Sequence, residues 1–256
     1  MPFTVSHIAA VLPLRRLPIL RALPLSALVI GSMLPDFAFL AGRVDREISH
    51  GFAGLFLFCL PMGWLVQLVF WHGLQAPLLD LAPRPLQRRL QAVLGMESRG
   101  LLHVSAGLLL GALTHIIWDA FTHAGNFGVQ ALPLLQTRVL TLGGEPLFAY
   151  ELLQHFSSAL GLIALAMYAC RWFTRSTPEE ARTTQYRVFW LLALLLVPGS
   201  VALLTLLAWL PIEHIDRIAA VAAGRSLEAA GLCLLAYALW WHRRRSVGRR
   251  QGAIRK

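Results

Sequence analysis

Residues 101–122 form one uninterrupted apolar block, LLHVSAGLLLGALTHIIWDAFT, and this block decides the fold class. An α-helix needs about 20 apolar residues to cross the hydrocarbon core of a bilayer. Inside lipid every backbone N–H and C=O group must be satisfied within the protein, so a span is a helix or part of a closed barrel. The apolar residues here are continuous rather than alternating. This pattern excludes a barrel and predicts a transmembrane helix.

Comparable blocks recur along the chain, which is 57% hydrophobic and only 14% charged. A soluble domain averages about 45–50% apolar and about 25% charged residues. The sequence therefore predicts an all-α polytopic integral membrane bundle of about six transmembrane helices, preceded by an N-terminal half-helix at Phe3–Leu14. The six predicted spans are Pro24–Gly42, Phe52–Gln75, Leu101–Thr122, Tyr150–Phe173, Arg187–Leu210 and Leu227–His242.

The whole chain, residues 1–256, is expected to form a single integral membrane domain. Its motifs fall in residues 1–165, and residues 166–256 contain generic spans and a basic tail. No internal repeat or low-complexity segment is visible.

The net charge of +10 is distributed unequally between the two sides of the predicted membrane. Eighteen of the 23 Lys and Arg residues fall on the side that holds the C-terminal tail. By the positive-inside rule this side is cytoplasmic, so we expect a multi-pass protein of the bacterial cytoplasmic (inner) membrane with a cytoplasmic C-terminus. The basic residues on the other side are Arg43, Arg46, Arg138, Arg217 and Arg225.

The expected partner of the protein is membrane lipid, with a lipid-like substrate as a further candidate, and the basic residues orient the chain in the membrane. They lie between apolar blocks and form no basic groove interleaved with aromatic residues, which argues against nucleic acid as a partner. The oligomeric state is not predicted.

The block at residues 101–122 also carries titratable side chains. His115 and Asp119 are one helical turn apart and share a face, which continues as Gly107 and Gly111 on one side and His123 on the other. Small residues allow another helix to approach closely, so this face is predicted to point into the bundle. The pair can share a metal ion, the carboxylate can orient the imidazole, or the two can simply hold helices together.

Two further candidates lie near the outer ends of the first two predicted spans. Asp36 follows Pro35, which kinks a helix, so its carboxylate either turns towards a cation or caps a new helical segment. His50 begins the second predicted span, and the short connection places it near the depth of Asp36. His7 reaches them only if the N-terminal segment descends from the outer face.

A second tier of candidates lies further along the chain. Glu151 and His155 form another pair one turn apart, more typical of an interface than of a ligand pair. With His123 they complete the second-tier set.

Four motifs carry a resemblance to a known group of proteins. PFTVSH at residues 2–7, GSMLPD at 31–36, SH at 49–50 and GALTHIIWD at 111–119 resemble an uncharacterised bacterial polytopic membrane-protein family. That family looks related to the membrane-bound, metal-dependent hydrolases of the bacterial inner membrane, and the likeness covers roughly residues 1–165. The metal ligands that this resemblance implies are His7, Asp36, His50, His115 and Asp119.

The chain departs from the hydrolase pattern at Ala38, where a second acidic residue is usual. Where the pattern has extra His or Arg before its Thr-His, this chain has only Asp45, Arg46 and Glu47. The motifs are therefore compatible with a site for one metal ion instead of two.

The favoured hypothesis is a membrane-embedded hydrolase that acts near the external headgroup level on a lipid ester or phosphoester. His and carboxylate ligands suit Zn²⁺, Mn²⁺ or Fe²⁺, and one or two ions are compatible with the motifs. Asp36 or Asp119 would act as the catalytic base. Two alternatives stay open: a proton- or metal-handling transporter, and a structural membrane protein whose His–Asp pairs only pack helices. Whether the protein is an enzyme at all is not decided by the sequence.

Overall fold

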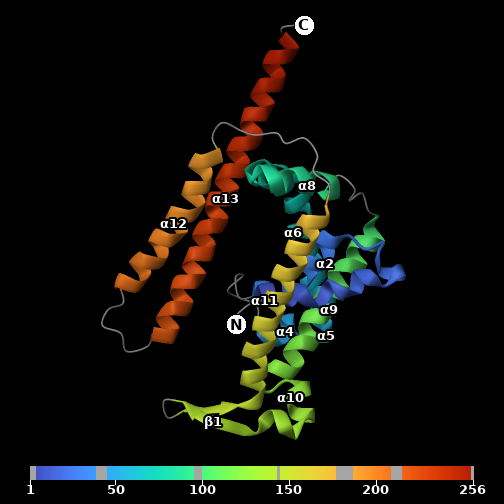
Figure 1. The fold of residues 1–256 in the computed structure, drawn as a ribbon, viewed down its shortest axis with the longest axis vertical. Coiled ribbons are helices and arrows are strands. Elements are labelled where there is room, and N and C mark those ends of the chain that lie inside the picture. Colours follow the sequence, from blue (N-terminus) through green and yellow to red (C-terminus); the bar gives the residue numbers. More distant parts are fainter. Residues whose placement is uncertain are drawn as a thin grey trace. The chain divides into compact units, whose positions relative to one another are not determined.

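The computed structural model describes residues 4–38, 45–94, 100–142, 145–176, 187–208 and 215–254. The described chain is helical nearly throughout, which confirms the all-α class (Figure 1). The described strands form one antiparallel hairpin, β1 (Arg138–Leu142) with β2 (Glu145–Phe148). Two compact units are distinguished. Unit one contains Met1–Leu68 and Glu97–Ser176, and unit two contains Val69–Met96 and Thr177–Lys256.

Four helices are long and apolar enough to cross a membrane, which indicates a membrane protein. The described part of the chain therefore supports four membrane spans and not the predicted six. These four are Phe52–Leu81, Leu101–Thr122, Ala149–Arg175 and Val188–Leu206.

The predicted span Pro24–Gly42 is not one continuous helix. Its α-helix, α2 (Leu25–Gly31), has only 7 residues and is followed by the 3₁₀ turn η4 (Leu34–Asp36). At about 1.5 Å per residue, α2 covers roughly 10 Å, about a third of the hydrocarbon core. Pro35 lacks a backbone donor and disfavours helical geometry at the residue before it. The apolar run is thus broken by backbone geometry that hydropathy does not detect.

The predicted span Leu227–His242 lies inside α13 (Ile215–Ile254), a helix of 40 residues that is not among the four candidate spans. Its apolar run is short because Glu228 stands at one end and Arg243 at the other. Within unit two, α13 packs along α12 (Arg187–Ala208), as the orange and red helices of Figure 1 show.

Unit two also contains α7 (Gln75–Leu81) and α8 (Arg84–Leu94). The buried Tyr237 of α13 donates a hydrogen bond to Asp80 Oδ2 of α7 at 3.1 Å, and Trp241 donates to the same atom. These contacts join α7 to α13 without involving any of the predicted ligands.

Unit one begins with an arm of short helical segments, residues 4–20, which we call the N-terminal arm. It contains η1 (Thr4–His7), α1 (Ile8–Val11), η2 (Pro13–Arg16) and η3 (Pro18–Leu20), each far shorter than a span. Val11 of the arm packs with Leu23 and Leu28 in a buried core cluster. The arm and α2 therefore form a helical hairpin.

This hairpin packs against two long helices, α9 (Leu101–Thr122) and α11 (Ala149–Arg175) (Figure 1). A Cβ atom on Gly111 of α9 would collide with the Leu28 carbonyl of α2, and one on Gly31 would collide with the Leu108 carbonyl of α9. Glycine at these positions permits the backbones to touch. The close approach brings η4 beside the C-terminal half of α9.

The connection from α9 to α11 is structured over most of its described length. It contains α10 (Phe127–Ala131), the 3₁₀ turn η7 (Pro133–Gln136) and the β-hairpin. Gly128 packs against the Ala120 carbonyl, and Asn126 donates to the Asp119 carbonyl at 2.9 Å. The connection thus lies against the end of α9 that carries the predicted ligands.

Candidate metal centre

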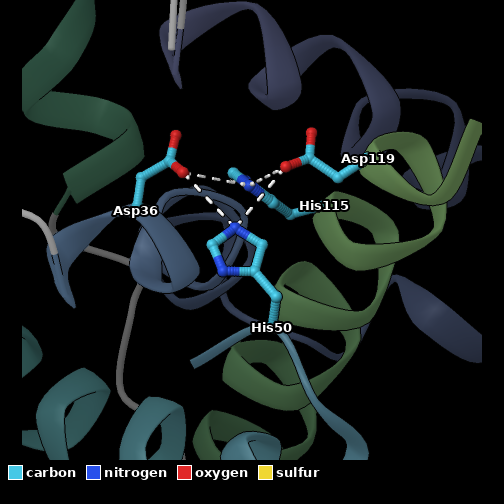
Figure 2. Close-up of side chains that lie close together, drawn as sticks. All are labelled: Asp36, His50, His115 and Asp119. Atoms are coloured by element: carbon cyan, nitrogen blue, oxygen red, sulfur yellow. Dashed lines mark ion pairs between the residues drawn. The ribbon is translucent and has the colours of Figure 1, made fainter. Parts of the chain in front are cut away.

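Four of the five predicted ligands meet at one point of unit one. Asp36 comes from η4, His50 follows α4 (Arg46–Ser49), and His115 and Asp119 come from α9. Each offers one ligand atom, and these four atoms all lie within 4.8 Å of one another. Figure 2 shows the two imidazoles between the two carboxylates. The group is largely buried.

The spacing of these four atoms fits a single small cation. His50 Nε2 lies 3.5 Å from Asp36 Oδ1 and 3.5 Å from Asp119 Oδ2, and His115 Nε2 lies 3.4 and 3.6 Å from the same oxygens. Tetrahedral ligands at about 2.1 Å from an ion are about 3.4 Å apart. With the other two separations no longer than 4.8 Å, a central point lies about 2.1–2.5 Å from all four atoms.

Both histidines are held with Nε2 towards this point. Nδ1 of His115 donates to the Ser32 carbonyl at 2.8 Å, and Nδ1 of His50 lies 2.9 Å from Ser49 Oγ and 3.3 Å from the Arg46 carbonyl. A carbonyl can only accept, so Nδ1 of His115 carries a proton, and in the neutral imidazole its Nε2 offers a lone pair to an ion. A backbone carbonyl behind the imidazole is the usual arrangement in metal sites.

Three of the four facing atoms are buried and have no hydrogen-bond partner in the described part of the chain. They are Asp36 Oδ1, His50 Nε2 and His115 Nε2. The other oxygen of Asp36 is satisfied, because it accepts from Thr4 Oγ1 at 2.6 Å. Buried polar atoms are nearly always hydrogen-bonded, so three buried atoms that face one another without a hydrogen bond favour a shared partner. A divalent cation would satisfy all three.

The fifth predicted ligand, His7, borders this group. Its Nε2 lies 3.6 Å from Asp119 Oδ1, the oxygen that faces away from the other ligands, and its ring stacks on His115 with centroids 3.8 Å apart. His123, a second-tier candidate, approaches the same Asp119 oxygen with its Nδ1 at 3.4 Å. The hairpin formed by the N-terminal arm and α2 brings His7 here.

The charges of the groups outside the spans follow from burial and from the charged groups that face them, chiefly the two converging carboxylates. Burial would raise the pKa of Asp36, but the facing imidazoles of His115 and His50 hold it well below its usual range. Burial would lower the pKa of His50, but the carboxylates of Asp119 and Asp36 raise it. Burial, reinforced by His115, lowers the pKa of His7 to about 4. Positive charge is therefore favoured between the carboxylates, as a cation site requires.

Arg46 is a site residue that the sequence did not single out. Its Nη2 donates to Asp119 Oδ2 at 2.5 Å, while its side chain is 37% exposed. Its position four residues before His50 could have indicated that the two side chains lie on the same side of a helical turn. Thr4 and Ser32 were also missed as partners of the ligands, although both lie inside the quoted motifs.

The remaining two second-tier candidates lie elsewhere. Glu151 Oε2 accepts from the Phe148 backbone N–H at 2.8 Å and so caps the start of α11. His155 is exposed on the same helix. Within the described residues, no contact joins either of them to the four-atom group.

Comparison with known proteins adds a family but no activity. Residues 1–241 match the family described as a domain of unknown function, DUF4184. No curated protein and no solved structure matches the chain. The matched region includes all four motifs and every residue of the candidate metal centre. The chain therefore belongs to the DUF4184 family.

Proposed function

We propose that this protein is a membrane-embedded, metal-dependent hydrolase of the bacterial inner membrane, related to the membrane-bound hydrolases that its motifs resemble. Asp36, His50, His115 and Asp119 would hold a divalent ion, with Zn²⁺, Mn²⁺ or Fe²⁺ suited to this donor set. The observation that carries the proposal is the set of three buried, unpaired ligand atoms that face one point.

The pattern of hydrogen bonds favours ligands over helix-packing pairs. If His115 and Asp36 only held helices together, their facing atoms would bond each other. Instead the outward atoms are hydrogen-bonded, His115 Nδ1 to Ser32 and Asp36 Oδ2 to Thr4. The inward atoms, His115 Nε2 and Asp36 Oδ1, lie 3.4 Å apart as an ion pair and have no hydrogen-bond partner within the described chain. Outer partners that orient inward donors are typical of metal ligands.

A divalent ion held here would supply Lewis-acid chemistry, lowering the pKa of water and polarising an ester or phosphoryl oxygen. Asp119 is the better placed base, because its Oδ1 has no hydrogen-bond partner in the described residues. Asp119 would take a proton from water as the water oxygen attacks the carbonyl carbon or phosphorus. The bond to the leaving oxygen breaks, and that oxygen receives the proton. His7 and His123, 3.6 and 3.4 Å from Asp119 Oδ1, can relay it.

Arg46 fits a role in substrate binding. Its guanidinium group already lies at the ligand set, yet more than a third of its side chain is exposed. A guanidinium group binds carboxylate or phosphate oxygens through paired N–H donors. Arg46 would therefore hold an anionic substrate oxygen next to the ion.

A lipid-like substrate is supported by a largely apolar cavity of about 370 Å³ whose lining includes Trp118, the neighbour of the ligand Asp119 in α9. Trp118 lines this cavity and packs against His7, with ring centroids 5.2 Å apart. The ligands His115 and Asp119 lie near the C-terminal end of α9, where a span meets the headgroups. The charge distribution in the sequence assigns this end to the external side. The other lining residues are the apolar Ala10, Ile117, Phe121 and Leu153 and the hydroxyl-bearing Thr114, Thr122 and Ser157.

The test compares metal content and hydrolysis in matched variants of the detergent-purified chain. His115→Ala should lower bound metal by at least about 10-fold, measured by elemental mass spectrometry. His103→Ala is the control, because His103 is exposed on the same helix α9 and outside the ligand group. Wild type and control should hydrolyse members of a lipid-ester and phosphoester panel in mixed micelles, and a chelator should abolish this activity.

Three results would count against the proposal. Metal-free wild type, or full metal occupancy in His115→Ala, would remove the metal centre. Stoichiometric metal without hydrolysis of any ester, together with metal or proton flux in proteoliposomes, would favour the transporter alternative.

A further inference from the structure

A second cavity of unit one, of about 910 Å³, lies between the N-terminal arm and the last third of α11. No acidic residue lines it, and among the described residues none of its arginines pairs with a carboxylate. The arginines that line it are Arg15, Arg16, Arg21, Arg171 and Arg175.

The positive-inside rule accounts for the side of the membrane on which these arginines lie, but not for their position around one cavity. Arg171 and Arg175 lie in the last turns of α11, where cations interact favourably with the helix dipole. Of the other three, Arg15 and Arg16 lie in the N-terminal arm and Arg21 directly follows it, and all three repel Arg171 and Arg175. Five guanidinium groups around one cavity are expected to be stable together when an anion lies among them.

The cavity lies at the far end of α11 from the metal centre. Trp118, next to the ligand Asp119, donates a hydrogen bond to Ser157 of α11 at 3.1 Å. Arg171 follows Ser157 by 14 residues, or about 21 Å along a helix. The arginines therefore lie near the opposite headgroup region of a span. Tyr168 and Trp172 also line the cavity, and such residues are enriched at membrane interfaces.

The lining changes from charged to apolar along α11. Ala164 and Met167 line the cavity towards the middle of the span, and the apolar Leu12 of the arm also lines it. Met167 precedes Arg175 by about two turns, or roughly 12 Å. Met167 is 48% exposed in the protein alone. A charged end and an apolar end in one cavity match the two ends of a phospholipid.

We propose that this arginine cavity binds an anionic phospholipid, with the headgroup phosphate among the five arginines and an acyl chain along Met167 and Ala164. Guanidinium groups bind phosphate oxygens in pairs, and basic pockets between membrane helices recognise anionic headgroups. The site is independent of the metal centre and does not require the hydrolase activity.

The test measures lipid binding to the full detergent-purified chain by native mass spectrometry. The probes are phosphatidylglycerol, the zwitterionic phosphatidylcholine and inorganic phosphate. Each basic residue near an anionic headgroup contributes roughly fivefold in affinity, so Arg171→Gln with Arg175→Gln should weaken phosphatidylglycerol binding about 25-fold. The control is Arg138→Gln with Arg225→Gln, which removes the same charge from exposed positions outside the cavity.

A second double variant, Arg15→Gln with Arg16→Gln, tests the opposite wall and should cause a similar loss. This variant also provides the test of lipid binding if the α11 variant fails to fold. Equal losses in the cavity and control variants would indicate non-specific attraction and overturn the proposal. Equal binding of phosphatidylcholine would overturn the role of the arginines. Inorganic phosphate that binds as tightly as the lipid would identify a site for a free phosphate compound instead.

Discussion

Replacing Asp119 with asparagine keeps the size of the side chain and its hydrogen bonding but removes its charge. In the folded protein, Asp119 Oδ2 faces His50 and His115 Nε2 at 3.5 and 3.6 Å, so it supplies one of the four candidate ligand atoms. A neutral amide oxygen is a poorer ligand. Loss of an outer partner alone weakens metal binding about 10–100-fold, so we expect at least about 100-fold here.

The same change should have little effect on the metal-free fold. It removes the repulsion between Asp119 and Asp36, whose facing oxygens lie within 4.8 Å. It also removes the ion pair with Arg46, which is worth at most about 1 kcal/mol because that side chain is 37% exposed. Buried polar contacts between membrane helices average only about 0.6 kcal/mol. These effects oppose each other, so the metal-free free energy of unfolding should change by no more than about 1 kcal/mol.

Thermal unfolding in detergent, with and without metal, separates the two effects. At a metal concentration about 100 times the wild-type Kd, binding stabilises wild type by about 2.7 kcal/mol and the variant by about 0.4 kcal/mol. The metal-induced rise in Tm should therefore be about 5–9 °C larger in wild type. Glu228→Gln, which removes an exposed carboxylate of α13, should behave as wild type. A full metal-induced rise in Asp119→Asn, with unchanged hydrolysis, would refute the assignment of Asp119 as a ligand.

Two further variants test the packing and the substrate contact. Gly111→Ala should destabilise the protein by about 3 kcal/mol in thermal unfolding, because its Cβ would overlap a backbone carbonyl of α2. The control is Gly224→Ala, which should not destabilise the protein, because a Cβ there meets nothing within 4 Å. Equal stability of the two variants would contradict the close contact between α2 and α9. Arg46→Gln should retain metal but lose about 100-fold in kcat/KM on an anionic ester, and parallel loss of metal would show that Arg46 only supports Asp119.

The membrane class and the composition of the candidate site could be predicted from local sequence. Hydropathy alone identifies the four helices of spanning length that the structure describes, because the apolar character of a span lies within one window of residues. The four-residue spacing of Gly107, Gly111, His115 and Asp119 predicts one buried helix face, and all four residues are buried. Both predictions depend only on positions within a single helix.

The failed spans show where local sequence is insufficient. Residues 24–42 are apolar enough to predict a span, yet the helix ends at Gly31. Pro35 and the contact of Gly31 with the α9 backbone favour a short helix and a 3₁₀ turn over a continuous helix. A hydropathy window counts apolar residues but does not detect that backbone break or the neighbouring helix.

The sequence by itself determined a helical membrane protein and a short set of His and Asp residues that could bind metal. Only the tertiary structure decided that Asp36 and His50 meet His115 and Asp119, that His7 lies beside them, and that Arg46 contacts the group. It also brought the arginines of the N-terminal arm to those of α11, about 150 residues later in the chain. The physical reason is that a periodic pattern specifies the face of one helix, whereas a site depends on how separate segments pack. That packing follows from the close α2–α9 contact and the proline breaks, which act between segments.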